Sequence, residues 1–367
     1  MTSYLPIQQN VLRVNKMNTK IFEIYDLDEK SRAELDEAGD AIKDGKLVIF
    51  PTETVYGLGA DATNPEAVRN IYIAKGRPSD NPLIIHISQP QEAERYACTS
   101  TLYYMLAEKF MPGPLTVILP AKDTVPSVTR GGLDTVAVRC PSSVVARELI
   151  KKAGVAVAAP SANLSGTPSP TSAEHVIKDM MGRVDVIVAS DDCEIGLEST
   201  IVKIEDEDSV TLLRPGAITV DQLCEVVNEV AIADAVTDKL GEGERPLSPG
   251  MKYRHYAPKA ELVLVDADRD DFIKTVLSDT SVDVAVIAYS EYMSDFIDSN
   301  VKIDVYDFGS SRDELVQARN LFSILRKTDE KSYTRIYAPL PEKKGMGLAL
   351  YNRMIRAAAH KIIRLRR

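Results

Sequence analysis

The sequence predicts an α/β fold with two units, a larger one built on a mostly internal sheet and a smaller one built on an open sheet. Short apolar runs rich in β-branched residues alternate with amphipathic segments, as in sheets that helices cover. A length of 367 residues is sufficient for two hydrophobic cores. Residues 241–250 hold three glycines and two prolines, which is the composition of a linker.

The strands of the first unit are predicted from apolar runs that end at Pro, Gly or Ser. These runs are Leu47 to Phe50, Leu83 to Ile87, Leu115 to Leu119, Thr135 to Val138, Val155 to Ala159, Val184 to Val188 and Ser199 to Ile204. Helix starts are predicted from capping-box spacing, in which a hydroxyl residue precedes Glu or Gln by three positions. The boxes are Ser31…Glu34, Thr171…Glu174 and Thr219…Gln222.

The second unit is predicted beyond residue 235. We expect strands at Glu261 to Val265, Val282 to Ala288 and Val301 to Tyr306, a long helix opened by the box Ser311…Glu314, and a last helix over Leu348 to Leu365. Residues 1–20 are polar and without periodicity, so we expect them to form a loosely held tail. The predicted organisation is a tail at 1–20, a first domain at 21–235, a linker at 236–258 and a second domain at 259–367.

The charge pattern limits the partners. The chain has 44 Lys and Arg against 54 Asp and Glu, and residues 1–240 carry 23 basic against 35 acidic side chains. An extended nucleic-acid-binding face needs clustered cations, so we expect weak or no direct binding to nucleic acid. Only Arg353 to Arg367 is locally basic.

Cysteine spacing and hydropathy limit the location. Cys98, Cys140, Cys193 and Cys224 have the spacing of neither a zinc site nor a disulfide framework. No apolar run reaches the roughly 20 residues that cross a bilayer. We therefore expect a cytoplasmic protein that does not contact a membrane.

The first polar motif, PTETVYGLG at residues 51–59, follows the first predicted strand. Hydroxyls and a carboxylate after a strand lie where α/β sheets bind ligands. Gly57, Gly59 and Ala62 also match the G-x-G-x-x-A fingerprint of dinucleotide sites, but six residues separate Phe50 from Gly57, so the match is weak. A turn with positive φ explains the glycines equally well.

Cationic side chains follow other predicted elements. Lys75 and Arg77 lie in a segment that Pro78 and Pro82 keep from being helical. The ammonium of Lys75 is a point charge and the guanidinium of Arg77 is a planar group with several donors, and together they suit a polyphosphate. The alternative is a solvated basic turn. Arg139 leaves a buried strand and therefore needs an anion, either a structural carboxylate or a substrate.

These loops predict one site. Four of five polar loops lie at predicted strand ends, and they carry Lys75, Arg77, Arg139 and Arg214 in an otherwise acidic domain. We therefore expect one locally positive pocket for an anionic small molecule. The sequence has no G-x-x-x-x-G-K-[ST] phosphate loop, and no spacing that supports a Ser–His–Asp or Cys–His nucleophile.

Six motifs place the chain beside a known family: PTETVYGLGADA, AKGRPSDNPLIIHI, MPGPLTVIL, VAVRCP, APSANLSG, and ESTIV followed by LRPG. Over roughly residues 30–220 the chain resembles the YrdC-like (Sua–YciO–YrdC) family. The segment SPGMKYRHYAP and the unit after it resemble the two-domain branch of that family, the long-form threonylcarbamoyl-AMP synthases. The resemblance implies a twisted open-sheet first domain with a large positive cavity, and a smaller Rossmann-like C-terminal domain.

The resemblance also implies an activity. It implies a nucleotidyltransferase that condenses L-threonine, bicarbonate and ATP, with Mg2+, into threonylcarbamoyl-AMP and releases pyrophosphate. Other enzymes then transfer the threonylcarbamoyl group to the adenosine beside the anticodon of certain tRNAs. The implied partners are these small molecules and the downstream tRNA-transfer machinery.

Site residues are implied motif by motif, and Lys75 and Arg77 form the implied catalytic pair. The implied ATP contacts are Lys75, Arg77, Asn81, Thr135, Asn163, Thr171 and Arg214. The implied threonine contacts are Thr54, His86, Arg139, Ser161, Ser199 and Thr200. Tyr253, Arg254, His255 and Tyr256 of the linker are implied to close over the phosphates as a lid.

Three other functions stay open at this stage. A non-catalytic protein that binds double-stranded RNA or tRNA is disfavoured by the acidic first domain, although the basic segment Arg353 to Arg367 could still contact tRNA. A hydrogenase-maturation enzyme that uses carbamoyl phosphate shares the YrdC-like domain, but it carries acylphosphatase-like and zinc-binding segments that this sequence lacks. A nicotinamide oxidoreductase rests on the glycine fingerprint alone.

Overall fold

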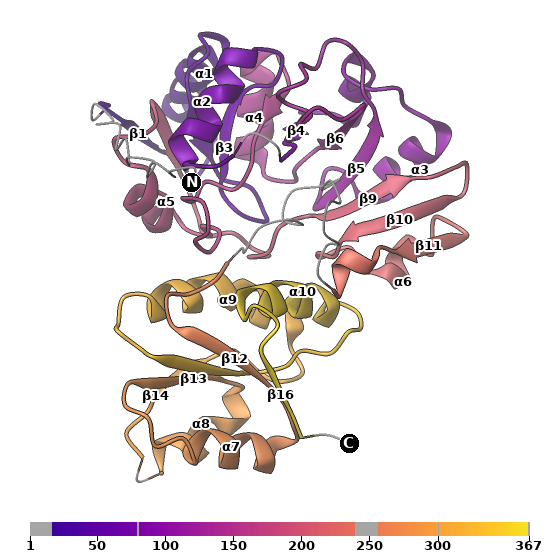
Figure 1. Cartoon of the computed structure of the whole chain (residues 1–367). Coiled ribbons are helices and arrows are strands. Elements are labelled where there is room, and N and C mark those ends of the chain that lie inside the picture. Colours follow the sequence, from indigo (N-terminus) through magenta and orange to yellow (C-terminus); the bar gives the residue numbers. More distant parts are fainter. Residues whose placement is uncertain (1–16, 79–80, 239–255, 300, 366–367) are drawn as a thin grey trace, which may run out of the picture.

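The computed structural model describes residues 17–78, 81–238, 256–299 and 301–365, and it contains two sheets that belong to two domains (Figure 1). The larger sheet has eleven strands in the order β1-β8-β2-β3-β7-β4-β6-β5-β9-β10-β11. The smaller sheet has five strands in the order β14-β13-β15-β12-β16. This two-domain α/β architecture confirms the predicted fold class.

The first domain mixes parallel and antiparallel strand pairs. Its strands are β1 (Lys20–Glu23), β2 (Val48–Phe50), β3 (Gly57–Asp61), β4 (Ile84–His86), β5 (Leu115–Pro120), β6 (Thr135–Arg139), β7 (Val157–Ala158), β8 (Val186–Ala189), β9 (Thr200–Ile204), β10 (Ser209–Arg214) and β11 (Glu229–Ile232). Its helices are α1 (Glu29–Lys43), α2 (Pro65–Lys75), α3 (Thr101–Phe110), α4 (Val144–Ala153), α5 (Ala173–Met180) and α6 (Val220–Leu223), with 3₁₀ turns η1 (Pro90–Arg95) and η2 (Asp234–Val236).

Helices cover both faces of the larger sheet near its centre. Alternate residues of β2 enter different cores: Ile49 packs with residues of α2 and α3, whereas Val48 and Phe50 pack with residues of α1 and α4. Because successive side chains of a strand point to opposite faces, this division shows that the sheet is buried on both sides. The continuous apolar runs of the sequence have this cause.

The second domain is an all-parallel open sheet with helices on both faces (Figure 1). Its strands are β12 (Glu261–Asp266), β13 (Val284–Ala288), β14 (Asp304–Asp307), β15 (Arg335–Pro339) and β16 (Ile362–Arg364). Its helices are α7 (Arg269–Leu277), α8 (Met293–Ile297), α9 (Glu314–Thr328) and α10 (Gly347–Ala357), with the 3₁₀ turn η3 (Ser290–Tyr292). In Figure 1, α9 and α10 lie between this sheet and the first domain.

Arginines of α9 join the two domains. The guanidinium of Arg326 forms a largely buried, two-pronged ion pair with Asp179 of α5, at 2.7 and 3.1 Å, and it also donates to the carbonyl of Pro168. Arg319 donates from Nε to the carbonyl of Glu194. Gly196 lies so close to α9 that a Cβ there would be 2.5 Å from the Cα of Arg319. The segment before β9 is therefore pressed against the second domain.

Several predicted element boundaries are wrong. Helix α1 is capped by Asp28 rather than Ser31, α5 by Ser172 rather than Thr171, and α9 by Asp313 rather than Ser311. In each case a nearby Asp or Ser has the extended backbone or the accepting oxygen that an N-cap needs, and spacing alone does not distinguish the candidates. The box at Thr219 and Gln222 is confirmed, with both reciprocal hydrogen bonds present.

The last predicted helix also ends early. Helix α10 stops at Ala357, the chain turns through Ala359 and His360 with positive φ, and β16 pairs with β12. The two isoleucines of β16 prefer a strand, and β12 offers them an edge. Strand β14 begins at Asp304 rather than Val301, and Lys20 already belongs to β1, which pairs with β8.

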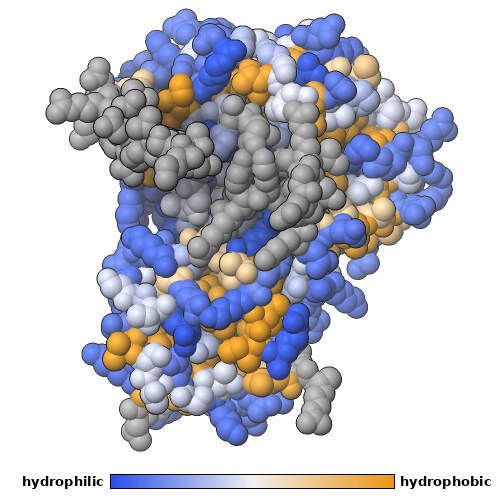
Figure 2. Space-filling model, viewed as in Figure 1, coloured by the Kyte–Doolittle hydropathy of each residue, from blue (hydrophilic) through white to orange (hydrophobic). Residues whose placement is uncertain are grey.

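The outer surface agrees with a protein whose apolar groups are mostly internal. Figure 2 shows a largely hydrophilic face, with hydrophobic side chains gathered in smaller patches on each domain. Among the residues that the structure describes, no helix is long and apolar enough to cross a membrane.

Gly57 and Gly59 lie in strand β3 and not in a turn with positive φ, so the turn interpretation is wrong. A Cβ on Gly59 would lie 2.7 Å from Val157 and 2.8 Å from the ring of Phe50. The glycine is needed for close approach of the neighbouring strands.

We therefore expect Gly59→Ala to lower the free energy of unfolding by about 1–3 kcal/mol, because it overpacks the core. Urea denaturation followed by circular dichroism measures this change. Replacing glycine by alanine at a strand position with room for a Cβ would instead leave stability unchanged or raise it, since alanine restricts the unfolded chain. A stability equal to or above that of the wild type would contradict the packing argument.

Candidate active site

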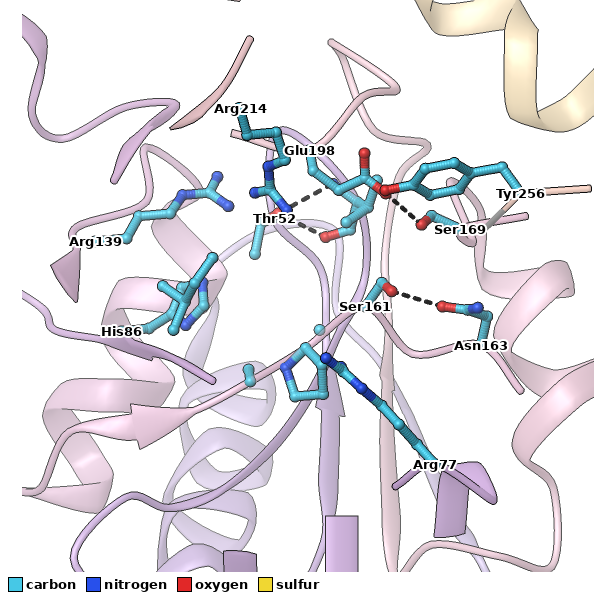
Figure 3. A pocket seen from close by; sticks show the side chains of 15 residues that line it. Thr52, Arg77, His86, Arg139, Ser161, Asn163, Ser169, Glu198, Arg214 and Tyr256 are labelled. Atoms are coloured by element: carbon cyan, nitrogen blue, oxygen red, sulfur yellow. Dashed lines mark hydrogen bonds between the residues drawn. The ribbon is translucent and has the colours of Figure 1, made fainter. Parts of the chain in front are cut away.

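Polar residues of the first domain surround a cavity that is open to solvent (Figure 3). Most of them follow the ends of strands in the middle of the large sheet, as expected for ligand sites in α/β folds. One, Tyr256, lies shortly before β12. The lining residues are Thr52, Val55, Gly57, Arg77, Ile84, His86, Arg139, Ala159, Pro160, Ser161, Asn163, Ser169, Glu198, Arg214 and Tyr256.

Strand pairing brings the deepest polar side chains together. β4 and β6 are parallel neighbours, and their last residues, His86 and Arg139, are register partners. Gly57 forms a bridge with Ser161, which joins the start of β3 to the loop after β7. In Figure 3, Arg139 and Arg214 enter the cavity from one side and Arg77 enters from the other.

Arg139 is paired with a carboxylate. Its NH2 group donates to Oε1 of Glu53 at 2.7 Å, and both side chains are buried. Within the described part of the chain, Nε of Arg139 and Oε2 of Glu53 have no hydrogen-bond partner. The structural carboxylate considered for this arginine is thus present, and part of the guanidinium is still available to a ligand.

His86 is buried in the neutral form. Burial, with a further contribution from Arg139, lowers the pKa of its imidazole to about 3. The ring meets Phe50 edge-on with 6.0 Å between centroids, and among the described residues its Nδ1 has no hydrogen-bond partner. A neutral imidazole with an unused nitrogen can donate or accept one hydrogen bond toward a ligand.

Lys75 is the last residue of α2 and is buried, so the expectation of a non-helical segment and the alternative of a solvated turn are both wrong for this residue. Gly76 adopts the left-handed conformation that ends the helix. The buried Lys75 ammonium donates to the carbonyls of Ser161 and Asn163. Burial and the neighbouring Arg77 lower its pKa well below the usual value. Lys75 therefore holds the loop after β7 in place from behind the cavity wall.

Glu198 is a buried carboxylate in the cavity wall. Its Oε1 accepts a hydrogen bond from Ser169 at 2.6 Å, and its Oε2 accepts one from Nε of Arg353 at 2.8 Å. Burial acts to raise the pKa of Glu198, but Arg353, Arg214 and Ser169 outweigh it and lower the pKa to about 2. Burial lowers the pKa of Arg214 to about 10, so both groups are charged at neutral pH.

Comparison with known proteins identifies the family. Residues 40–216 match the Sua5_yciO_yrdC family model, described as telomere recombination, and residues 218–359 match the threonylcarbamoyl-AMP synthase C-terminal domain. Threonylcarbamoyl-AMP synthase from Pyrococcus abyssi is 42% identical over 345 residues, which cover 89% of this chain and 95% of that protein. The Bacillus subtilis protein of the same name is 39% identical over 358 residues, covering 95% of this chain and all of the relative. The chain belongs to the threonylcarbamoyl-AMP synthase family.

A solved structure agrees with this assignment. The crystal structure of Pyrococcus abyssi Sua5 complexed with L-threonine superposes with a TM-score of 0.86 at 39% identity, and the match covers 95% of this chain and all of that one. Family membership confirms the resemblance and the enzyme class predicted from the motifs.

The structure brings seven of the family-implied residues to the cavity and leaves others outside its wall. Those that line it are Arg77, His86, Arg139, Ser161, Asn163, Arg214 and Tyr256. Thr54 hydrogen-bonds to the wall residue Thr52, and Ser199 accepts from Arg214. Tyr253, Arg254 and His255 lie outside the described residues.

The remaining family-implied residues are not among those that line the cavity. Thr200 donates to the carbonyl of Ile218, and the backbone N–H of Thr171 donates to His175. Thr135 begins β6, four residues and roughly 13 Å along the strand from Arg139. Asn81 is buried, and among the described residues its side-chain amide has no partner.

The sequence did not single out Ser169 or Arg353 as site residues, and it noted the carboxylate of Glu53 without assigning it a role. Glu53 lies inside the PTETVYG motif, where an acid among residues of an apolar neighbourhood is the signal that could have found it. Arg353 is fully buried against Glu198, so its assignment to a basic segment able to contact tRNA is wrong. Its pairing joins residues 155 positions apart, which no local pattern indicates.

The buried neutral state of His86 predicts a pH effect on stability. Its pKa is about 3 in the folded chain against an ordinary 6.5, so between these values the unfolded chain binds a proton that the folded chain does not. Stability is complete above about pH 6.5 and falls as the pH drops. We expect His86→Gln to remove up to about 1.4 kcal/mol of this loss for each pH unit.

Urea unfolding of wild type and His86→Gln at pH 7.5, 6.0 and 5.0 measures the difference. His175→Gln serves as a reference, because burial lowers the pKa of His175 to about 4 and a similar slope should disappear. Parallel pH profiles for wild type and His86→Gln would show that this imidazole is not held neutral.

Proposed function

We propose that the protein condenses L-threonine, bicarbonate and ATP into threonylcarbamoyl-AMP in this cavity and releases pyrophosphate. The observation that carries the proposal is the convergence of Arg77, Arg139 and Arg214 on one cavity whose other polar groups include hydroxyls and an amide. This set suits a substrate with several anionic groups. We further propose that the product supplies threonylcarbamoyl groups to tRNA-modifying enzymes of the cytoplasm.

The two ends of the cavity suit the two organic substrates. His86 and Arg139 lie together at the ends of β4 and β6, where the unused Nε of Arg139 can bind the carboxylate of threonine. Arg77 and Asn163 lie on the opposite side and suit the phosphates of ATP, and Arg214, which enters from the side of Arg139, adds a positive charge that can act on them across the cavity. Ser161 lies between the two groups and can contact either substrate.

The reaction needs positioning more than covalent help. The threonine amine combines with carbon dioxide from bicarbonate to give a carbamate, and a carbamate oxygen then attacks the α-phosphorus of ATP. The bond from that phosphorus to the bridging oxygen breaks, and pyrophosphate leaves with the electron pair. Guanidinium groups that bind the phosphates stabilise the developing charge, and the fixed wall keeps the two reactants in line.

Mg2+ belongs to the proposal as the counter-ion of ATP. Among the described residues, no three His, Cys, Asp or Glu side chains cluster as they would to hold a metal. Glu198 of the cavity wall and Glu53, which contacts the wall residue Arg139, are each paired with an arginine. A Mg2+ ion that keeps phosphate and water ligands fits this wall, because such ions are commonly bound through substrate phosphates.

The linker is proposed to complete the site. Tyr256 lines the cavity, and its ring stacks on Phe322 of α9 with 5.0 Å between centroids. Its backbone has a φ of 64°, which a residue other than glycine rarely adopts and which persists only where the surroundings fix it. Tyr256 thereby connects the linker to both domains. The domain boundaries at 235 and 258 and the role of residues 253–255 stay predictions.

Pyrophosphate release tests the function. With ATP, Mg2+, L-threonine and bicarbonate present, we expect steady release, and we expect it to collapse when threonine or bicarbonate is left out. A coupled phosphate assay with added pyrophosphatase measures the rate, and chromatography identifies the adenylate. Release that is indifferent to both omissions would contradict the proposal.

Arg77→Ala tests the phosphate side of the cavity. Truncating a charge-assisted hydrogen bond costs about 1.5–3 kcal/mol, so we expect the KM for ATP to rise by about 10-fold to 100-fold while the KM for threonine changes little. The matched control is Arg69→Ala on α2, the helix that ends just before Arg77; its exposed guanidinium pairs with Glu66 outside the cavity. Equal ATP kinetics in the two variants would exclude Arg77 from phosphate binding.

A further inference from the structure

We infer that Arg353 of the second domain is a positioning residue for the reaction in the first domain. It pairs with Glu198 and so leaves the charge of Arg214 available to the anionic substrate. This inference rests on the proposed function, since it assumes that the cavity binds ATP. It assigns the second domain a direct part in substrate binding.

The contacts of Arg353 fix its guanidinium completely. Nε donates to Oε2 of Glu198 at 2.8 Å, NH2 donates to the backbone carbonyl of Glu198 at 3.3 Å, and NH1 donates to Oδ1 of Asn352 at 2.8 Å. Asn352 in turn donates to the carbonyl of Val236, near the end of the first domain. The side chain of Arg353 is fully buried. A guanidinium held on three nitrogens cannot turn toward the cavity or exchange partners easily.

Glu198 connects Arg353 to the residues of the cavity. One carboxylate oxygen contacts Arg353, and the other accepts from Ser169, which lines the cavity with it (Figure 3). On the other side of Glu198 lies Arg214, whose Nε and NH2 donate to the carbonyl and hydroxyl of Ser199. Arg214 and Arg353 are the two cations whose charges stabilise the ionised carboxylate.

Removing Arg353 would change the partner of Glu198. A buried carboxylate that loses its partner is costly, so it would draw Arg214 away from Ser199 or take up a proton. Tyr256, the other titratable group that faces Glu198 here, is neutral because burial raises its pKa to about 12, so it cannot supply the missing positive charge. With an ionised Glu198 the cavity loses one positive charge that would act on the phosphates.

A second interdomain pair separates this effect from simple domain attachment. Arg326 and Asp179 also form a largely buried ion pair between the domains, and Arg326 donates to Pro168 next to Ser169. Neither partner of this pair lines the cavity. Arg326→Met therefore loosens the interface to a comparable degree without leaving a carboxylate unpaired in the cavity wall.

The experiment compares four full-length variants: Arg353→Met, Glu198→Gln, the double variant Arg353→Met/Glu198→Gln, and Arg326→Met. Titration calorimetry measures the Kd of ATP with Mg2+, and pyrophosphate release gives kcat and KM. We expect Arg353→Met to weaken ATP binding by about tenfold or more, which is the effect of about 1.4 kcal/mol. The double variant should regain most of this loss, because it contains neither the cation nor the unpaired carboxylate. Arg326→Met should bind ATP within about threefold of wild type.

Three results would overturn the inference. These are a double variant that binds ATP as weakly as Arg353→Met, an Arg326→Met variant with the same loss, and an Arg353→Met variant with unchanged ATP affinity. If Arg353→Met does not fold, Arg353→Lys keeps the charge without the fork and should bind ATP within about threefold of wild type, and a larger loss counts against the inference. Direct ATP binding separates the two proposals, because it can be measured even if no substrate set releases pyrophosphate.

Discussion

The structure of the site depends on charge balance within one small cavity. Arg77, Arg139 and Arg214 meet there, and like charges in a partly desolvated space repel one another strongly. Two buried carboxylates, Glu53 and Glu198, offset part of this repulsion without neutralising it. The site thus keeps a net positive charge that suits a polyanion, and the two carboxylates reduce the repulsion that would otherwise destabilise the folded chain. The acidic composition of residues 1–240 has a different consequence, since it disfavours binding of an extended nucleic acid, whereas the cationic cavity suits a small anion.

This balance explains why the second domain is packed so closely against the first. Arg353 of α10 reaches Glu198 in the segment before β9, and Gly196 in the same segment allows the close approach of the neighbouring helix α9. Leu197 and Val55, beside the cavity residues, belong to the same hydrophobic cluster as the core of the second domain. The apolar contacts supply much of the free energy that holds the two domains together. The ion pair between Arg353 and Glu198 additionally requires the domains to be aligned, because a buried ion pair is favourable only in good geometry. The contacts that pack the two domains together therefore also fix the geometry of the site.

Local sequence patterns predicted the features that depend on nearby residues. Strands such as β5 and β6 were evident because their runs are apolar throughout, and the cap at Thr219 was evident because its partner lies three residues away. The cavity side chains Arg77, Arg139 and Arg214 followed from their positions beside strands. Features that depend on distant residues were not predictable: Gly59 is a strand residue because of Phe50 and Val157, and Arg353 is a core residue because of Glu198. The resemblance supplied roles for motif residues, but it did not distinguish side chains that face the cavity from those that build its wall.

That distinction can be argued from which polar atoms already have partners. The ammonium of Lys75 is committed to the carbonyls of Ser161 and Asn163, and the hydroxyl of Thr200 is committed to Ile218, so a contact with substrate would require either group to break an existing buried bond. Asn81 is the opposite case, because its amide is buried and, among the described residues, has no partner. An unsatisfied buried amide costs about 1–3 kcal/mol, and a ligand atom that satisfies it recovers that cost on binding. The amide of Asn81 can therefore gain a partner without breaking an existing bond, whereas Lys75 already fixes the backbone of the loop after β7.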